Sequence, residues 1–339
     1  MTNTIPISIL ELALITQDSN ASATLEKTKE VAQLADTLGF KRFWLAEHHN
    51  MAHVASSATV VLIGYIASQT QNIRVGSGGI MLPNHSPIIV AEQFGTLETL
   101  YPNRIDLGLG RAPGTDAVTA KAIRKDFYEQ SQQFPQNVTE LQNYFSLENA
   151  TAKVRAFPAE GTNVPIWILG SSMESAALAA SKGLPYAFAG HFAPRQMQQA
   201  FEFYRDNFQA SEFLEHPYTI ACINAIAADT DQEAEILSSS LYLLFGNLVQ
   251  NNRKPLQPPV ESVSHLLNEM SEEARFHVNQ MTACSFVGSK QTLDKELKEF
   301  IRFSGADELM ISSPIYDHQD KLKSFQLLKE VMDAMNVAN

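Results

Sequence analysis

The sequence predicts an α/β fold, and within that class a (β/α)8 TIM barrel with insertions. Two observations support this prediction: eight short apolar segments are typical of buried parallel strands, and segments of helical periodicity separate them. The 339 residues fit one barrel with insertions, and no repeat or low-complexity tract divides them. We therefore expect one domain over residues 1–339, with a doubly wound open sheet as the alternative fold.

The predicted strands alternate with predicted helices along the whole chain. Helices are expected between Ser22 and a left-handed stop at Gly39, over residues 55–68, after a Ser86-Pro87 start, and over 293–301. Segments 121–128 and 138–147 read as helices of an insertion, and the polar, proline-rich segment 250–259 reads as a mobile loop and a possible lid. The predicted strands are residues 5–14, 43–46, 73–82 with a glycine break, 104–111, 165–169, 186–189, 218–227 and 308–312.

The composition describes a protein with a large core and an acidic surface. Hydrophobic residues make up 45% of the chain, charged residues 18%, and the formal net charge is -12. This charge argues against nucleic acid or an anionic membrane as a partner, because binding phosphates requires clustered Lys and Arg. Cys222 and Cys284 lie in apolar surroundings, which favours free thiols, and the sequence shows neither a signal peptide nor a membrane span. We expect a cytoplasmic protein.

Three titratable residues, Glu47, His48 and His49, follow the second predicted strand directly. The carboxyl ends of parallel strands are where α/β folds bind ligands, and a carboxylate that orients an imidazole is suited to acid–base chemistry. A solvated polar loop explains the pattern equally well. A metal site is disfavoured because Asn50 stands where a zincin motif has glutamate, and because adjacent histidines point to opposite sides of an extended segment.

The glycine-rich segments do not match nucleotide-binding motifs. Met81 and Pro113 occupy the positions of the last glycine in the two candidate dinucleotide fingerprints, and no Walker sequence occurs. The chain therefore shows no sign of a Rossmann unit for NAD. The glycines in the third strand instead indicate a bulge or a place where a ligand approaches the backbone.

Residues Gly170, Ser171 and Ser172 join the fifth predicted strand to a helix, so their backbone N–H groups and hydroxyls offer an anion site. Arg111, at the end of the fourth strand, can supply a forked cation to the same phosphate. The alternatives are a serine that caps the helix and an arginine in a surface ion pair. Together with the glycines and the Glu47 cluster, these residues suit a phosphorylated planar cofactor.

The same segments carry a family resemblance. The sequence resembles the luciferase-like monooxygenases, the flavin-dependent family of bacterial luciferase, and most closely its small single-chain branch. The resemblance runs from about Ile5 to Met335, and its fold is a (β/α)8 barrel that binds reduced FMN at the carboxyl-end mouth. The matching segments are Phe43-Trp-Leu-Ala-Glu-His-His-Asn50, Arg74-Val-Gly-Ser-Gly-Gly-Ile-Met-Leu-Pro83, Ala91-Glu92, Pro102-Asn-Arg-Ile-Asp-Leu-Gly-Leu-Gly-Arg111 and Val287-Gly288.

The resemblance assigns expected roles residue by residue. Glu47 and His48 fall on the acidic residue and the catalytic histidine of the family. Gly78 and Gly79 fall on the pair that forms a non-proline cis peptide beneath the flavin ring, and the phosphate-binding positions are Arg111 and Ser171.

Three departures separate the chain from luciferase itself. Gly170 stands where luciferase has a glutamate that need contribute only its backbone, and Gly110 replaces a reactive cysteine. The segment between Gly246 and Thr282 is shorter than the lid region of luciferase. The last two departures argue against light emission from an aldehyde.

The resemblance implies an FMN-dependent oxidoreductase, more specifically a monooxygenase that acts on paired donors and passes oxygen from O2 to a small organic substrate. His48 is expected to act as general base or hydrogen-bond partner, with Glu47 positioning it. A separate flavin reductase is expected to supply reduced FMN, since the chain lacks a pyridine-nucleotide motif. Alternatives are hydride transfer with the deazaflavin F420 and a non-catalytic flavin-binding protein. Homodimers through early helices are usual in the family, so a homodimer is expected.

Overall fold

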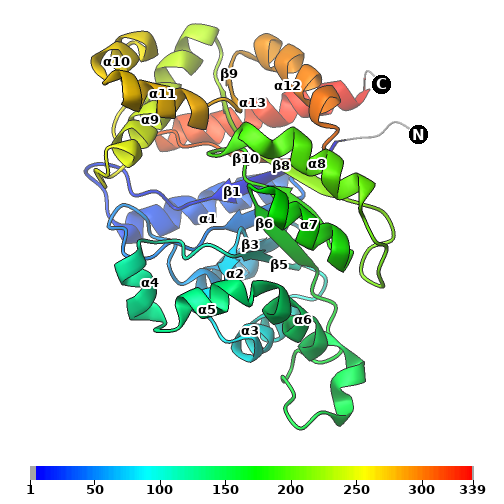
Figure 1. Cartoon of the computed structure of the whole chain (residues 1–339). Coiled ribbons are helices and arrows are strands. Elements are labelled where there is room, and N and C mark those ends of the chain that lie inside the picture. Colours follow the sequence, from blue (N-terminus) through cyan, green and yellow to red (C-terminus); the bar gives the residue numbers. More distant parts are fainter. Residues whose placement is uncertain (1–4, 338–339) are drawn as a thin grey trace.

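The computed structural model describes residues 5–337 and shows a closed parallel barrel with helices between its strands (Figure 1). The strand order is β10-β1-β2-β3-β5-β6-β7-β8, and pairing of β10 with β8 closes the ring. The barrel strands are β1 (Ile7–Glu11), β2 (Arg42–Leu45), β3 (Arg74–Ser77), β5 (Ile105–Gly110), β6 (Ile166–Gly170), β7 (Tyr186–Phe188), β8 (Thr219–Ala227) and β10 (Glu308–Ser312). All eight predicted strands are thus confirmed, as is the (β/α)8 barrel.

Two further short strands belong to the same sheet. Strand β4 (Ile80–Met81) resumes the course of β3 after the glycines and pairs with β5. Strand β9 (Ser285–Gly288) pairs with the carboxyl half of β8, beyond the residues that pair with β7. Sequence patterns predicted the resumption that forms β4 but not β9, because β9 is short and mostly not buried.

Helices cover the outside of the barrel. They are α1 (Ala21–Leu38), α2 (Thr59–Ser68), α3 (Pro87–Leu100), α4 (Ala117–Ile123), α5 (Phe127–Gln132), α6 (Phe134–Phe145), α7 (Met173–Lys182), α8 (Met197–Asp206), α9 (Asp231–Val249), α10 (Val263–Glu269), α11 (Glu272–Met281), α12 (Lys290–Ser304) and α13 (His318–Val337). Helix α1 ends at Gly39 in the left-handed conformation, as predicted. Helix α3 begins at Pro87, although Ser86 makes no side-chain cap hydrogen bond.

The predicted helices of the insertion have the wrong boundaries. The predicted helix 121–128 joins the end of α4 to the start of α5, across residues that form no helix in the structure. The predicted helix 138–147 begins inside α6, which starts at Phe134. Helix α6 buries Val138 and Leu141 and packs against α3, so it belongs to the outer layer of the barrel. Short helices with weak periodicity gave no clear boundary signal.

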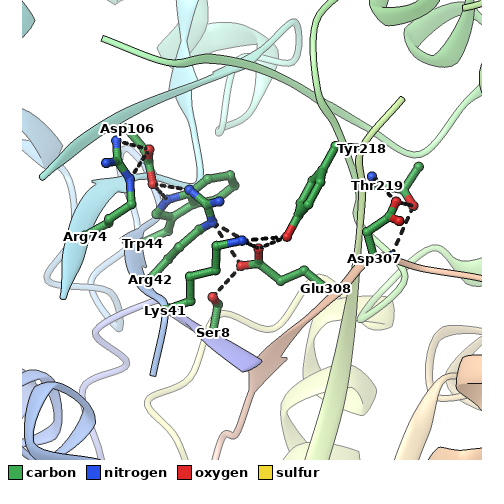
Figure 2. Close-up of polar contacts among 10 residues, drawn as sticks. All are labelled: Ser8, Lys41, Arg42, Trp44, Arg74, Asp106, Tyr218, Thr219, Asp307 and Glu308. Carbon is green, nitrogen blue, oxygen red and sulfur yellow. Dashed lines mark hydrogen bonds and ion pairs between the residues drawn. The ribbon is translucent and has the colours of Figure 1, made fainter. Parts of the chain in front are cut away.

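The amino-terminal half of the barrel interior is closed by a buried charge network (Figure 2). Arg42 of β2 donates to Asp106 of β5 at 2.8 Å and to Glu308 of β10 at 2.9 Å. Arg74 donates to the other oxygen of Asp106 at 2.8 Å, and the Tyr218 hydroxyl donates to Glu308 at 2.8 Å. Both carboxylates therefore have cationic partners, which buried ions require.

An apolar layer lies next to this network along the strands. Its buried members, from six barrel strands, are Leu10, Trp44, Trp167, Ala187, Ile220, Cys222 and Met310. The rings of Trp44 and Trp167 meet edge to face at 5.3 Å between centroids. The interior is thus filled from its amino-terminal end, so any ligand site must lie at the other end. Within residues 5–337, no helix has the combination of length and apolar character that a bilayer span needs.

Candidate functional site

The predicted site residues gather at the mouth, defined here as the carboxyl ends of the barrel strands with the loops that follow them. Glu47 and His48 follow β2, the Gly78-Gly79 pair lies between β3 and β4, Arg111 follows β5, and Ser171 precedes α7. Strands β2, β3, β5 and β6 are consecutive neighbours in the barrel. The structure therefore brings the four groups predicted from the sequence to one side of one mouth.

Glu47 is buried, and several donors surround its carboxylate. His49 and His85 approach it through Nε2 at 2.8 and 2.9 Å, and the Met81 N–H donates to it at 3.1 Å. A further contact comes from the amide of Asn84 at 3.2 Å. Burial alone would raise the pKa of Glu47, but the hydrogen bonds from His49 and His85 outweigh it and lower the pKa to about 2. Glu47 is therefore an anion that organises the mouth.

Glu47 was expected to position His48, but its carboxylate is hydrogen-bonded to other histidines. The carboxylate is hydrogen-bonded to the neighbouring His49 and to His85, and His48 reaches it only through electrostatic attraction. Adjacent side chains of an extended segment point to opposite sides, so Glu47 and His49 share one side and His48 takes the other. His85 is 38 residues away in sequence from Glu47, and no local pattern revealed this contact.

The His48 side chain is partly exposed at the mouth. Its backbone N–H donates to the Ser56 carbonyl at 3.0 Å, which fixes the loop. Its Nδ1 is buried without a hydrogen-bond partner in the part of the chain that the structure describes. Burial lowers the pKa of His48 to about 4, despite the opposing charge of Glu47. The ring is thus neutral near pH 7.

Glycines form the floor of the mouth between β3 and β5, where side chains have no room. The Gly78-Gly79 peptide bond is cis, as the resemblance implied. A Cβ on Gly79 would lie 2.8 Å from the Gly108 carbonyl oxygen, and a Cβ on Gly108 would lie 2.2 Å from the Ser77 carbonyl oxygen. Gly78 is partly exposed, whereas Gly79 is buried. The mouth therefore has a bare backbone floor that a flat ring can approach closely.

The amino-terminus of α7 uses one of its two candidate serines as a cap. Ser172 forms a capping box with Ser175, in which each side-chain oxygen accepts from the other residue's N–H at 3.4 Å. Ser172 thus fulfils the helix-cap alternative. The Ser171 side chain is partly exposed and makes no hydrogen bond within residues 5–337. Gly170 leaves the space that Ser175 fills, because a Cβ there would lie 2.2 Å from its Oγ.

Arg111 is exposed and lies close enough to the first turn of α7 to affect it. A hydrogen bond with Ser172 lowers the pKa of Glu174, and the charge of Arg111 lowers this pKa further. The structure shows no ion pair within 4 Å between Arg111 and a described carboxylate. Because β5 and β6 are neighbours, a cation and a helix amino-terminus with a free hydroxyl lie on the same side of the mouth, an arrangement suited to a phosphate monoester.

The segment 250–259, predicted to be a mobile loop, is tethered to the mouth. Leu256 is buried and bridges to Thr16 in the loop after β1. Arg253 pairs with Asp116 at 3.3 Å and donates to the Asn50 carbonyl at 3.1 Å. Proline-rich composition predicts irregular structure but not such long-range contacts, so the prediction missed the tether.

The described residues include no group of three His, Cys, Asp or Glu side chains arranged to hold a metal ion. Both cysteines are free thiols, as predicted. Glu47 and its histidines are instead engaged with one another. The residues at the mouth fit a phosphorylated flavin better than a metal ion, because the glycine floor, the cation Arg111 and the amino-terminus of α7 all lie there.

Comparison with known proteins identifies the family of the chain. The family profile described as luciferase-like monooxygenase matches residues 6–308. A luciferase-like monooxygenase of Escherichia coli (strain K12) is 45% identical over 332 residues, covering 98% of each chain. The N-acetyl-S-alkylcysteine monooxygenase of Bacillus subtilis (strain 168) is 32% identical over 339 residues, covering 97% of this chain and 98% of its own.

Solved structures show the same fold. The crystal structure of apo-MsnO8 superposes with a TM-score of 0.88 at 33% identity, covering 97% of this chain and 98% of that one. The oxygenating constituent of 3,6-diketocamphane monooxygenase from Pseudomonas putida, solved with FMN, gives 0.72 at 17% identity over 97% and 98%. An F420-dependent secondary alcohol dehydrogenase gives 0.68 at 17% identity over 98% and 99%. The family profile and the relatives at full length show that this chain belongs to the luciferase-like monooxygenase family.

Proposed function

We propose that the chain is a flavin-dependent monooxygenase that uses reduced FMN and O2 on a small organic substrate. The observation that carries the choice of cofactor is the placement of Arg111 and the free Ser171 hydroxyl at the amino-terminus of α7, beside the glycine floor. A phosphate with two negative charges is stabilised by a guanidinium fork and by helix N–H groups. The monooxygenase activity is supported by family membership.

In this proposal the phosphate of FMN binds to Arg111, Ser171 and the backbone of Gly170 and Ser172, and its ring lies against Gly78 and Gly79. When bound, reduced flavin supplies the two electrons with which O2 is activated. The carboxylate of Glu47 holds the loop after β2 through His49 and holds the loop after β4 through His85. His48, neutral near pH 7, acts as a hydrogen-bond partner of a group bound in the mouth.

We propose a separate flavin reductase as the source of reduced FMN. The sequence has no dinucleotide fingerprint and no Walker sequence, so a nicotinamide cofactor has no recognisable site of its own. One relative in the comparisons, a trigonelline monooxygenase of Acinetobacter baylyi at 22% identity, is named as an oxygenase component. That name describes the relative, and the same division of labour is our proposal for this chain.

The cofactor is tested by anaerobic binding of reduced FMN to wild type and to Arg111→Ala. We expect the substitution to weaken binding about tenfold or more, because it removes a charge-assisted contact. Arg302→Ala is the matched control, since Arg302 is exposed in the last turn of α12, which leads into the amino-terminal end of β10. Oxidised FMN and F420 are titrated in parallel. Equal binding of reduced FMN to wild type and Arg111→Ala would reject the phosphate site.

The parallel titrations separate the alternatives. F420-dependent hydride transfer is kept as a second candidate because the fold matches that of an F420-dependent dehydrogenase. Binding of F420 with no binding of FMN would establish hydride transfer as the better proposal. Tight retention of oxidised FMN, with no reaction of the reduced form with O2, would favour a non-catalytic flavin-binding protein.

We also propose a homodimer through α2 and α3. These two helices expose Val61 (69%), Ile89 (47%) and Leu100 (62%), and exposed large apolar side chains are typical of subunit interfaces. Val61→Glu together with Leu100→Glu is expected to give a monomer by sedimentation, because a charge buried at an interface is costly. Val118→Glu, on α4, is the control, because Val118 is an even more exposed apolar residue (80%). A wild-type monomer would contradict the proposal.

A further inference from the structure

A second histidine enters the mouth from the side opposite His48. His191 lies three residues after the end of β7, and the closed strand order places β7 four positions from β2 in either direction around the ring. The two histidines therefore come from opposed walls of the barrel. Both follow the carboxyl ends of their strands, and a positive charge on His48 would lower the pKa of His191. This pairing of residues far apart in sequence is not visible from any motif.

The backbone at His191 is held firmly in place. The buried side chain of Asn224 on β8 donates to the His191 carbonyl at 2.6 Å and also contacts the Ser285 hydroxyl of β9 at 3.1 Å. Gly190 packs against β8 so closely that a Cβ there would lie 2.8 Å from the Cys222 carbonyl oxygen. The ring of His191 also meets Phe192 edge to face at 4.8 Å. The position of the imidazole is therefore a product of the fold.

The two rings have the same unusual environment. Each side chain is partly exposed, and each Nδ1 is buried without a partner in the described structure. Neither Nε2 has a hydrogen-bond partner among residues 5–337, and neither is enclosed, so it is the nitrogen that a molecule in the mouth can reach. Burial lowers the pKa of His191 to about 3, with a further contribution from His48. Both rings are thus neutral near pH 7.

A neutral imidazole carries its proton on one nitrogen only. A buried N–H without an acceptor is rarer and costlier than a buried lone pair without a donor, so the proton is expected on Nε2 of each ring. The mouth then presents two N–H donors from opposite walls. A single acceptor oxygen between them satisfies both. An anion is disfavoured there because ionised Glu47 adjoins His48.

We propose that His48 and His191 together form a two-donor site that binds the acceptor oxygen of an uncharged substrate group, such as an amide or another carbonyl. This inference deepens the proposed function, since the oxygen would be held at the same mouth as the flavin. It adds His191 as a substrate-binding residue. It also predicts the chemical class of the group that the enzyme recognises.

The test uses N,N-dimethylacetamide, which carries an acceptor oxygen and no N–H donor, and acetate as its anionic match. NMR spectra of histidine-labelled full-length protein at pH 7 follow each imidazole, and ring nitrogen shifts report which nitrogen is protonated. The variants are His48→Phe and His191→Phe, which keep a ring without donors, and His191→Gln, which restores one N–H. The control is His216→Phe, an exposed position in the loop before β8.

We expect dimethylacetamide to move the His48 and His191 signals together with one Kd, and both Nε2 atoms to be protonated. His191→Phe is expected to raise this Kd about threefold or more, whereas His191→Gln and His216→Phe leave it near the wild-type value. Movement of one signal only, protonation at Nδ1, or equal binding of acetate would overturn the proposal. If His191→Phe does not fold, the wild-type shifts and protonation states still decide.

The outcome is independent of the flavin. Each titration is repeated with FMN present, and reduced FMN binding to wild type is measured separately. If reduced FMN does not bind but both histidine signals move with the amide, the proposed function fails and the two-donor site stands. If FMN binds and the histidine signals do not move, the two-donor site is rejected while the proposed function remains.

Discussion

At the scale of single residues, Glu47 controls the mouth through its ionisation. Its hydrogen bonds favour the carboxylate over the neutral acid, so the folded state holds its pKa at about 2, against an ordinary value of 4.5. A carboxyl group whose pKa is lower in the folded state stabilises that state at pH values above its pKa in the unfolded chain. For Glu47 this contribution is lost as the pH falls from about 4.5 toward 2. The size of this pKa shift sets an upper limit, on the order of 3 kcal/mol near pH 7, to what ionised Glu47 contributes to the free energy of unfolding.

We therefore expect Glu47→Gln to lower the free energy of unfolding by about 2 to 3 kcal/mol at pH 7. The deficit should shrink as the pH is lowered below about 4.5, because wild type then loses the same contribution. Urea unfolding of both proteins at several pH values checks this. Glu215→Gln, at an exposed position, is the control. A deficit that is constant with pH would contradict the assignment of the anion.

Sequence reasoning found Glu47 and His48 but assigned the wrong contact between them. The signal it used was local adjacency, and alternation along an extended segment separates neighbours. Besides His49, the partners of Glu47 include Asn84, in the short 3-10 turn after β4, and His85, which ends that turn. His191 was missed for the same reason, because its relation to His48 arises only when the barrel closes.

At the scale of elements, the amino-terminus of α7 divides two tasks between adjacent serines. Ser172 caps the helix, whereas Ser171 is free to contact a ligand. We expect Ser172→Ala to lower the free energy of unfolding by about 1 kcal/mol. Ser171→Ala should leave stability unchanged and weaken binding of reduced FMN about tenfold, because it removes a hydrogen bond to a charged phosphate. Urea unfolding and anaerobic titration of both variants measure the two effects.

This pair of substitutions is its own control, since each serine serves as the reference for the other. Ser171→Ala that loses stability while keeping flavin affinity would reverse the assignment. The sequence Gly170-Ser171-Ser172 predicted an anion site or a cap and left both alternatives open. Only the capping box with Ser175, which Gly170 accommodates by lacking a side chain, showed that Ser172 is the serine that caps the helix.

Strands were predictable where burial on both faces produced continuous apolar runs, as in Phe43, Trp44 and Leu45 of β2. Strand β9 lacked that signal because it adds to one end of β8 and stays partly exposed. Helices α4 and α5 were merged because neither is long enough to show a stripe of its own. Element type therefore followed from the local sequence, whereas short elements depended on tertiary contacts.

At the scale of the whole molecule, ion pairs across the barrel interior join strands from both ends of the chain. Arg42 and Glu308 are 266 residues apart in sequence, yet they bond at 2.9 Å next to the β1 strand that separates β2 from β10. The eight-strand count predicted that such a ring would close. It did not predict which charges would meet, because the register between β2, β5 and β10 is fixed only in the closed barrel.

Arg42 is the central member of this network. Its guanidinium lies 4.4 Å from the Trp167 ring centroid and bonds to Asp106 and Glu308, whose attraction raises the pKa of Arg42 against the effect of burial. Arg42→Met removes the shared cation and leaves two buried carboxylates close together. We expect the free energy of unfolding to fall by about 3 kcal/mol, at the lower end for a broken buried pair. The reason for this lower value is that Arg74 and Lys41 remain as partners.

A second substitution distinguishes unpaired charge from lost packing. Glu308→Gln in the Arg42→Met background removes one of the two anions that have lost their shared cation, so the double variant should be more stable than the sum of the single effects predicts. Urea unfolding of the four proteins gives this coupling. Reduced FMN affinity should be unchanged in any variant that folds, because the network lies at the amino-terminal ends of the strands, away from the mouth. Additive losses would mean that Arg42 acts through packing on Trp167 instead of through charge.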